Sequence, residues 1–292
     1  MFTIVTDTSS NLPTPIAKKA GLYVIPFTYT IDGKVYTSED TEAFDGVEFY
    51  GKIKTGMKVT TSLINSQTYL DHFGTIAGQG QDILFIAMSS GISGSYGCSV
   101  QAARETMEKY PDITVKTIDT MGASLGEGLV ALEAARLRDE GKTLEETFQA
   151  CRSMAVHMGQ VFTVDSLSHL RRTGRCSNYK AAIGTVLNIK PLLKGNEIGQ
   201  IVTYGQVRGR KKSLQALAKS YEDHVQNADK QTIGIAHSAC VDDAVYLIGL
   251  LKASKHPPKD ILTVMYEPVT GSHVGPGAVA LFFVGDEHVR SI

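Results

Sequence analysis

The stretch "DILFIAMSSGISGSYG" (residues 82–97) joins an apolar run to a helical pattern through a loop of serine and glycine. The apolar half has the length and composition of a buried strand, and a strand followed by a helix is the repeating unit of α/β folds. Glycine permits tight turns, and serines beside the first N–H groups of a helix offer hydrogen bonds to an anion. The stretch therefore predicts an α/β fold with an anion-binding loop after this strand.

Similar runs recur along the chain with helical patterns between them, which is typical of α/β architecture. These runs are "FTIVTD" (2–7), "GLYVIPFTYTID" (21–32), "ITVKTIDT" (113–120), "VFTVDS" (161–166), "IGQIVTYGQV" (198–207), "QTIGIAHS" (231–238), "ILTVMYEPV" (261–269) and "AVALFFVG" (278–285).

Two helical patterns in succession, 124–141 and 143–158, interrupt this rhythm near residues 155–160. The second begins with Thr143 and Glu146 at capping-box spacing. We therefore expect an N-terminal α/β domain (1–157) with a mostly parallel sheet and a C-terminal α/β domain (158–292). Gly195-Asn196 lies between two strand-like runs and predicts a hairpin, so the second sheet should be mixed.

Composition limits the function classes. The chain has 292 residues, a hydrophobic fraction of 42% and a formal net charge of -1. Without a dense basic block it should bind neither nucleic acid nor an anionic membrane through a polybasic segment. No signal-peptide pattern or membrane-length apolar run is present, so we expect a cytoplasmic protein. The four cysteines lack C-x-x-C spacing and the histidines lack metal-ligand spacing, so we expect no metal or redox site.

Three polar clusters are candidates for chemistry, and each has a structural alternative. "TTSLINS" (60–66) puts Thr61 and Ser62 before a helical start, where hydroxyls cap a helix or hold a ligand oxygen. "GSHVGPG" (271–277) places His273 in a predicted loop, either as a structural histidine or as a donor or base. In the serine loop, Ser93 is the third candidate. One serine is enough to cap the helix, so the other serines of the loop are available to a ligand.

Two arginine-rich turns and two acids complete the candidates. "HLRRTGRCS" (169–177) and "QVRGRKKS" (206–213) are either solvated basic faces or sites for a phosphate or an acidic partner. Asp7 and Asp119 end predicted strands as lone carboxylates, which either cap turns or orient a hydrolase built on Ser93 and His273. The sequence has neither the P-loop nor the nucleophile-elbow motif around the serine loop.

Taken in order, these clusters resemble the DegV family of bacterial fatty-acid-binding proteins over essentially the whole chain. The blocks that carry the resemblance are "IVTDTSSNLP" (4–13), "TTS" (60–62), "SSGISGSY" (89–96), "IDTMGASLGEGLVALEAARL" (118–137), "LRRTGR" (170–175), "NIKPLL" (188–193), "VRGRKKSLQAL" (207–217) and "GSHVGPGAVALFF" (271–283). Two departures stand out: Leu63 and Ile64 follow the T-S motif where the family often has Gln-Pro, and Thr173 replaces a usual glycine.

The resemblance implies a non-catalytic lipid carrier with no cofactor. One long-chain fatty acid, such as palmitate, stearate or oleate, would lie in a tunnel of the C-terminal domain with its carboxylate near the domain interface. The partner would be an ATP-dependent fatty acid kinase that makes an acyl phosphate, and the resemblance is compatible with transient membrane contact. By position, the carboxylate ligands are Thr61, Ser93 and His273, the supporting loop residues are Ser62, Gly94, Gly271 and Ser272, and the residues near the head group or kinase are Arg175 and Arg208.

Overall fold

The computed structural model describes residues 2–176 and 188–291, which form two compact units. Unit 1 contains the chain up to residue 44 together with 60–156, and unit 2 contains 45–59 together with 157–292. A single boundary at residue 157 would place 45–59 in the first domain. These residues belong to unit 2 because helix α2 (Gly46–Lys54) buries an apolar face there, and the Tyr50 hydroxyl donates a hydrogen bond to the Tyr266 carbonyl oxygen at 2.8 Å.

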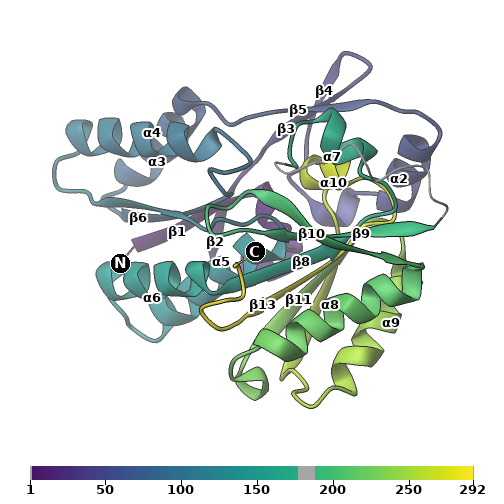
Figure 1. Cartoon of the computed structure of the whole chain (residues 1–292). Helices are drawn as coiled ribbons and strands as arrows, with labels where there is room; N and C mark the ends of the chain where they lie inside the picture. Colours follow the sequence, from purple (N-terminus) through teal and green to yellow (C-terminus); the bar gives the residue numbers. More distant parts are fainter. Residues whose placement is uncertain (1, 177–187, 292) are drawn as a thin grey trace. The chain divides into compact units, whose positions relative to one another are not determined.

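Unit 1 is built on a parallel four-stranded sheet with the order β2-β1-β6-β7. Helices α3 and α4 pack together on one face, and α5 and α6 pack together on the other (Figure 1). The principal elements are β1 (Phe2–Asp7), α1 (Thr14–Lys19), β2 (Leu22–Ile25), α3 (Ser66–Ala77), β6 (Asp82–Ala87), α4 (Ser95–Lys109), β7 (Val115–Asp119), α5 (Leu125–Asp139) and α6 (Leu144–Val156).

The apolar strands of unit 1 lie in the middle of this sheet because helices cover both faces. Ile4 and Val5 of β1 and Leu84 and Phe85 of β6 have no exposed surface, as expected for central strands of a parallel sheet. The predicted capping box of α6 is confirmed, since Thr143 Oγ1 accepts from Glu146 N at 3.2 Å and Glu146 Oε2 accepts from Thr143 N at 2.9 Å.

The strand order places a topological switch point between β1 and β6. The chain leaves β1 toward β2 on one side and leaves β6 toward β7 on the other. Ligands of open α/β sheets bind beyond the carboxyl ends of the strands at such a point. In unit 1 this position is occupied by Asp7, at the end of β1, and by the serine loop that follows β6.

Unit 2 contains a mixed six-stranded sheet with the order β10-β9-β8-β13-β11-β12, in which only the β11/β12 pair is parallel. Helices α8 and α9 pack together against it, and their apolar faces form a core with strands β8, β11 and β13 (Figure 1). The main elements after α2 are β8 (Met158–Thr163), α7 (Ser168–Arg172), β9 (Ile189–Gly195), β10 (Ile201–Arg208), α8 (Arg210–His224), β11 (Thr232–His237), α9 (Val241–Lys252), β12 (Asp260–Met265), α10 (Pro268–Val274) and β13 (Val279–Val284).

The predicted hairpin is present between β9 and β10, but its turn is longer than two residues. Asn196 organises it, because its Oδ1 accepts from Ile198 N at 3.2 Å and from Gln200 N at 2.8 Å. Sequence patterns do not separate the strands of a small third sheet with the order β4-β3-β5. These strands are β3 (Thr28–Ile31), β4 (Lys34–Thr37) and β5 (Val59–Ser62), and three 3-10 turns, η1 (Thr8–Ser10), η2 (Thr41–Ala43) and η3 (Ala228–Lys230), complete the described part of the chain.

Candidate functional site

The serine loop after β6 is folded by its own hydroxyls and carbonyls. Ser89 is fully buried, its N–H donates to Gly122 O at 2.8 Å, and its carbonyl accepts from Ser93 N at 3.1 Å. The Ser89 hydroxyl oxygen accepts from Gly91 N at 3.0 Å. Asp119 holds the other side through Ser90 N at 3.3 Å. Ser89 is therefore a structural residue, and the loop carries Ser93 in a fixed position.

Ser93 is half-buried and lies at the start of α4, next to exposed Gly94. Its Oγ accepts from Ser95 N at 3.2 Å, and its hydroxyl donates to Ser95 Oγ at 3.0 Å. Gly94, the residue that precedes the helix, makes no side-chain cap. The hydroxyl of Ser93 thus covers the first helical N–H, and the residue as a whole stays partly exposed.

Thr61 and Ser62 lie in strand β5 rather than at the start of a helix, which corrects the sequence-based expectation. Helix α3 begins later and is capped by Asn65, whose Oδ1 accepts from Thr68 N at 2.9 Å. The connection between β5 and α3 still meets the serine loop, because Ile64 N donates to Ser95 Oγ at 3.2 Å. The half-buried Thr61 and exposed Ser62 therefore stand two to three residues from a direct link to the Ser93 loop.

His273 lies on helix α10, whereas the sequence predicts a loop there. The helix forms because Pro268 occupies its first turn and buried Glu267 caps it, accepting from Val269 N at 2.6 Å and Thr270 N at 2.5 Å. It ends at Gly275, whose φ of +78° suits glycine. An added Cβ at Gly275 would also lie 2.3 Å from His169 Cδ2.

The two residues before His273 pack inward. Gly271 faces Tyr50 so closely that an added Cβ would lie 1.7 Å from the tyrosine hydroxyl oxygen. The Ser272 side chain is buried, and its hydroxyl donates to Val269 O at 2.9 Å. In the structure both residues support the helix that carries His273, and the Ser272 hydroxyl is directed to its own helix.

Unit 2 brings His273 and Arg175 close together. Burial lowers the pKa of His273 to about 4, and the positive charges of Arg175 and Arg172 contribute to this lowering. Arg175 follows α7, and its Nη1 donates to Thr173 O at 2.5 Å. Thr173 closes α7 with ordinary helical dihedrals, and Gly174 supplies the positive φ. Thr173 therefore fits at a position where the family often has glycine. The lowered pKa makes His273 a neutral imidazole near the positive charges of Arg175 and Arg172.

Arg208 is placed differently from Arg175. It is the last residue of β10, an edge strand of the unit 2 sheet, and its side chain is exposed. It pairs in register with Ile189 across the β9–β10 hairpin. The Arg208 side chain is therefore accessible from solvent.

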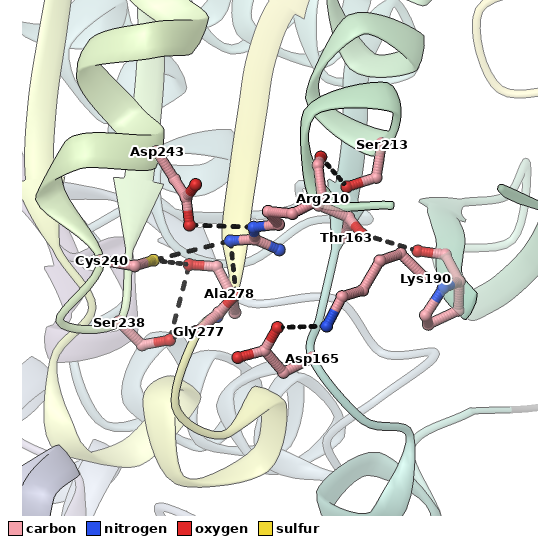
Figure 2. Close-up of polar contacts among 11 residues, drawn as sticks. Thr163, Asp165, Lys190, Arg210, Ser213, Ser238, Cys240, Asp243, Gly277 and Ala278 are labelled. Atoms are coloured by element: carbon pink, nitrogen blue, oxygen red, sulfur yellow. Dashed lines mark hydrogen bonds and ion pairs between the residues drawn. The ribbon is translucent and has the colours of Figure 1, made fainter. Parts of the chain in front are cut away.

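A cluster around Arg210 is absent from the sequence-based predictions. Arg210 Nη2 donates to Gly277 O at 2.7 Å, and its Nε pairs with Asp243 Oδ2 at 2.9 Å (Figure 2). Nearby, Lys190 Nζ lies 2.7 Å from Asp165 Oδ1. Arg210 therefore fixes the loop that follows α10. The sequence does indicate that Arg210 lies on the buried face of α8. It precedes the buried residues Ser213, Leu214 and Leu217 by three, four and seven positions, which is the spacing of one helix face.

Asp7 is not a lone carboxylate, which corrects the interpretation from sequence. Ser9 joins it to Glu127 of α5, because the Ser9 hydroxyl oxygen lies 2.5 Å from Asp7 Oδ1 and 2.7 Å from Glu127 Oε2. Both acids are fully buried. Burial raises the pKa of Asp7 to about 6, and burial together with the Asp7 charge raises the pKa of Glu127 well above its usual value. Burial therefore favours protonation of both acids, and the negative charge of Asp7 favours it further at Glu127.

The described residues add three observations on other site types. No cluster of three histidine, cysteine or acidic side chains among them could hold a metal ion. Within residues 2–176 and 188–291, no helix has the length and apolar composition needed to cross a bilayer. The cysteines, which are Cys98, Cys151, Cys176 and Cys240, form no disulfide in this part of the chain.

Comparison with known proteins identifies the family. The family model described as uncharacterised proteins of the DegV family matches residues 1–286. The chain belongs to the DegV family. A DegV domain-containing protein of Clostridium perfringens is 39% identical over 285 residues, which cover 98% of both chains. The resemblance seen in the sequence is thereby confirmed.

Two solved DegV structures are similar over nearly the full length. A fatty-acid-binding DegV protein of Thermus thermophilus has a TM-score of 0.87 and 28% identity, covering 96% of this chain and 98% of its own. A fatty-acid-binding DegV protein of Streptococcus agalactiae has a TM-score of 0.84 and 29% identity, covering 97% and 98%. The predicted α/β fold, with one parallel and one mixed sheet, is confirmed, whereas the ligand roles of Thr61, Ser93 and His273 stay predictions.

Proposed function

We propose that this DegV protein binds one long-chain fatty acid non-covalently and carries it without catalysing a reaction. The observation that supports the proposal most directly is the similarity to two fatty-acid-binding DegV structures, which extends over at least 96% of the chain. Each buried methylene contributes about 0.8 kcal/mol, and a bilayer offers nearly the same gain. Selective binding therefore depends on the carboxylate, so the head-group residues determine whether the acid is retained.

We propose Thr61, Ser93 and His273 as the carboxylate ligands. A buried carboxylate is costly unless hydrogen bonds satisfy it, and bonds to a charged group are stronger than neutral ones. Two hydroxyls and a neutral imidazole can each donate one proton. The neighbouring charges of Arg175 and Arg172, which act with burial to lower the pKa of His273 to about 4, also provide a positive field that favours an anion.

The first test is the lipid content of the protein purified from cells, measured by mass spectrometry. We expect the wild type to retain a C14 to C18 acid and Ser93→Ala to retain at least about tenfold less, because removal of a charge-assisted hydrogen bond costs roughly 1.5–3 kcal/mol. Ser90→Ala changes an exposed serine of the same loop and should retain as much acid as the wild type. Equal lipid content in the Ser93 variant would remove Ser93 from the site.

A serine hydrolase built on Ser93 and His273 is the alternative function. Asp7 and Asp119 are the two candidates for the orienting acid of such a hydrolase, and both have other partners. Asp7 accepts from Ser9, and Asp119 accepts from the backbone N–H groups of Ser90 and Met121. A fluorophosphonate probe labels an activated serine. Labelling of Ser93 by this probe would favour the hydrolase and contradict the carrier.

We propose further that the bound acid is presented to a cytoplasmic, ATP-dependent fatty acid kinase after transient contact with the membrane. The exposed Arg208 and the half-buried Arg175 could hold an anionic group of the kinase or of its product. We expect Arg208→Ala to lower acyl-phosphate formation at least about tenfold while leaving lipid retention unchanged. Arg152→Ala, an exposed arginine on α6 of unit 1, is the control. Loss of lipid in Arg208→Ala with unchanged phosphorylation per bound acid would reverse this assignment.

A further inference from the structure

Ser95 connects Ser93 to the interior of unit 1. Ser95 is buried, and its Oγ accepts one hydrogen bond from Ile64 N–H at 3.2 Å and one from the Ser93 hydroxyl at 3.0 Å. A serine oxygen has two lone pairs and one proton. Both acceptor positions of Ser95 are therefore filled, and its own proton must be donated to another group. The hydroxyl of Tyr69 lies beside Ser95 and is the group positioned to receive it.

Tyr69 of α3 lies near the strand that carries Asp7, because its ring packs on Phe85 of β6, which pairs in register with Val5 of β1. Its ring packs against Phe73 and Phe85, with centroid distances of 5.7 Å and 5.1 Å, and the whole side chain is buried. Burial raises the pKa of Tyr69, and the charges of Asp7 and Glu127 raise it further. Apart from its contact with Ser95, the Tyr69 hydroxyl has no hydrogen-bond partner among the residues the structure describes. The proton of a buried hydroxyl is thus left without an acceptor in the electrostatic field of the acid pair.

Asp7 presents a matching unpartnered atom. Its Oδ1 accepts from Ser9 N at 2.8 Å and from the Ser9 hydroxyl, and the Met88 backbone and the Glu127 side chain also interact with the carboxylate. Its buried Oδ2 has no hydrogen-bond partner of normal geometry within the described part of the chain. Two buried polar groups of this kind are characteristic of an internal water position. The titratable groups that face this position are Glu127 of α5 and Tyr69 of α3, with Cys98 of α4 beside the tyrosine.

We propose that a water between Asp7 and Tyr69 completes a hydrogen-bonded chain to Ser95 and Ser93, and that this chain couples carboxylate binding to proton uptake by the Asp7–Glu127 pair. The inference rests on the proposed role of Ser93 as a carboxylate ligand. Asp7 and Tyr69 act in it as positioning residues, because neither needs to touch the fatty acid.

The coupling follows from the single proton on each hydroxyl. When Asp7 is ionised, every proton in the chain points toward it, so Ser93 donates inward to Ser95 and presents only oxygen lone pairs to a carboxylate. When Asp7 carries a proton, the order reverses: Tyr69 donates to Ser95, Ser95 donates to Ser93, and the Ser93 proton points outward. Each hydroxyl group of the chain keeps one proton in both states. The proton that Asp7 gains comes from solvent. The difference is one hydrogen bond, which corresponds to about a five- to tenfold change in affinity.

The test is the affinity for oleate between pH 5 and pH 8, measured by calorimetry for the wild type and three variants. We expect the wild-type affinity, relative to that of Asp7→Asn and Tyr69→Phe at the same pH, to rise about five- to tenfold as the pH falls through this range. In Asp7→Asn, Ser9 still donates to Oδ1, so the amide NH2 faces Tyr69 and fixes the outward order. In Tyr69→Phe, Ser95 can donate only to Ser93. Both variants should therefore bind oleate about five- to tenfold more tightly than the wild type at pH 8 and about as tightly as the wild type at pH 5.

Tyr110→Phe, which removes a tyrosine hydroxyl elsewhere in unit 1, should keep the wild-type pH dependence. Titration of oleate itself and of His273 is common to all four proteins and cancels in the comparison. An unchanged pH dependence in both Asp7→Asn and Tyr69→Phe overturns the coupling while leaving the carrier function intact. Absence of oleate binding to the wild type at every pH overturns the carrier function instead.

Discussion

Replacing Gly271 with alanine is expected to destabilise unit 2 by at least about 3 kcal/mol, although alanine favours helices over glycine by roughly 1 kcal/mol. The reason is steric, because the new Cβ would lie 1.7 Å from Tyr50 Oη and 2.8 Å from its Cζ. The tyrosine cannot simply rotate away. It is fully buried, and its hydroxyl donates to Tyr266 O at 2.8 Å. Helix α10 must therefore move, and His273 moves with it.

Urea unfolding and lipid retention measure the two consequences. Gly249→Ala on α9 is the matched control, because a Cβ there meets nothing within 4 Å, and it should be neutral or stabilising by up to about 1 kcal/mol. Tyr50→Phe removes the closest atom and should restore part of the loss in the double variant, although alone it costs about 1 kcal/mol. Strict additivity of the two substitutions would show that the contact is not the cause.

The elements of the fold that were predictable are those with strong local signals. The run 82–87 is apolar on both faces because helices cover both sides of β6, and Thr143 with Glu146 forms its capping box without help from the rest of the chain. Strands β4 and β5 carry no such signal, since their side chains are largely exposed and polar. Helix α10 escapes prediction because its glycines resemble a loop, whereas they are there to let Tyr50 and His169 approach.

The candidate site was predictable only where residue type carries the chemistry. The hydroxyls of Thr61 and Ser93 and the imidazole of His273 could be selected from sequence, but their settings could not. Glu127 is the clearest case: it stands in the apolar pattern of α5, and only the structure brings it to Asp7, 120 positions earlier, through Ser9. Pairings at that separation depend on the strand order, which local patterns do not encode.

Because of the Asp7–Glu127 pair, the stability of unit 1 should decrease as the pH rises. The substitution Asp7→Asn should reveal this dependence. Burial raises the pKa of Asp7 from 3.8 to about 6. A raised folded-state pKa contributes stability that is fully present below pH 3.8 and is lost as the pH rises through about 6. Because a tenfold change in a protonation equilibrium corresponds to about 1.4 kcal/mol, Asp7→Asn should stabilise the protein by on the order of 2–3 kcal/mol at pH 8 and by little at pH 4.

The difference in unfolding free energy between Asp7→Asn and the wild type is measured by urea unfolding at pH 4, 6 and 8. Hydrogen exchange of native-state β1 peptides at the same pH values is a second measurement. His273 acts in the opposite direction, because its pKa is lowered to about 4 and its contribution is lost as the pH falls from 6.5 toward that value. Both proteins contain His273, so the difference between them isolates Asp7 together with its effect on Glu127. Asp112→Asn, at an exposed position, should change stability by less than about 0.5 kcal/mol at every pH. A difference between Asp7→Asn and wild type that stays constant from pH 4 to pH 8 would mean that Asp7 is not the titrating group, and the proton-coupled chain to Ser93 would lose its basis with it.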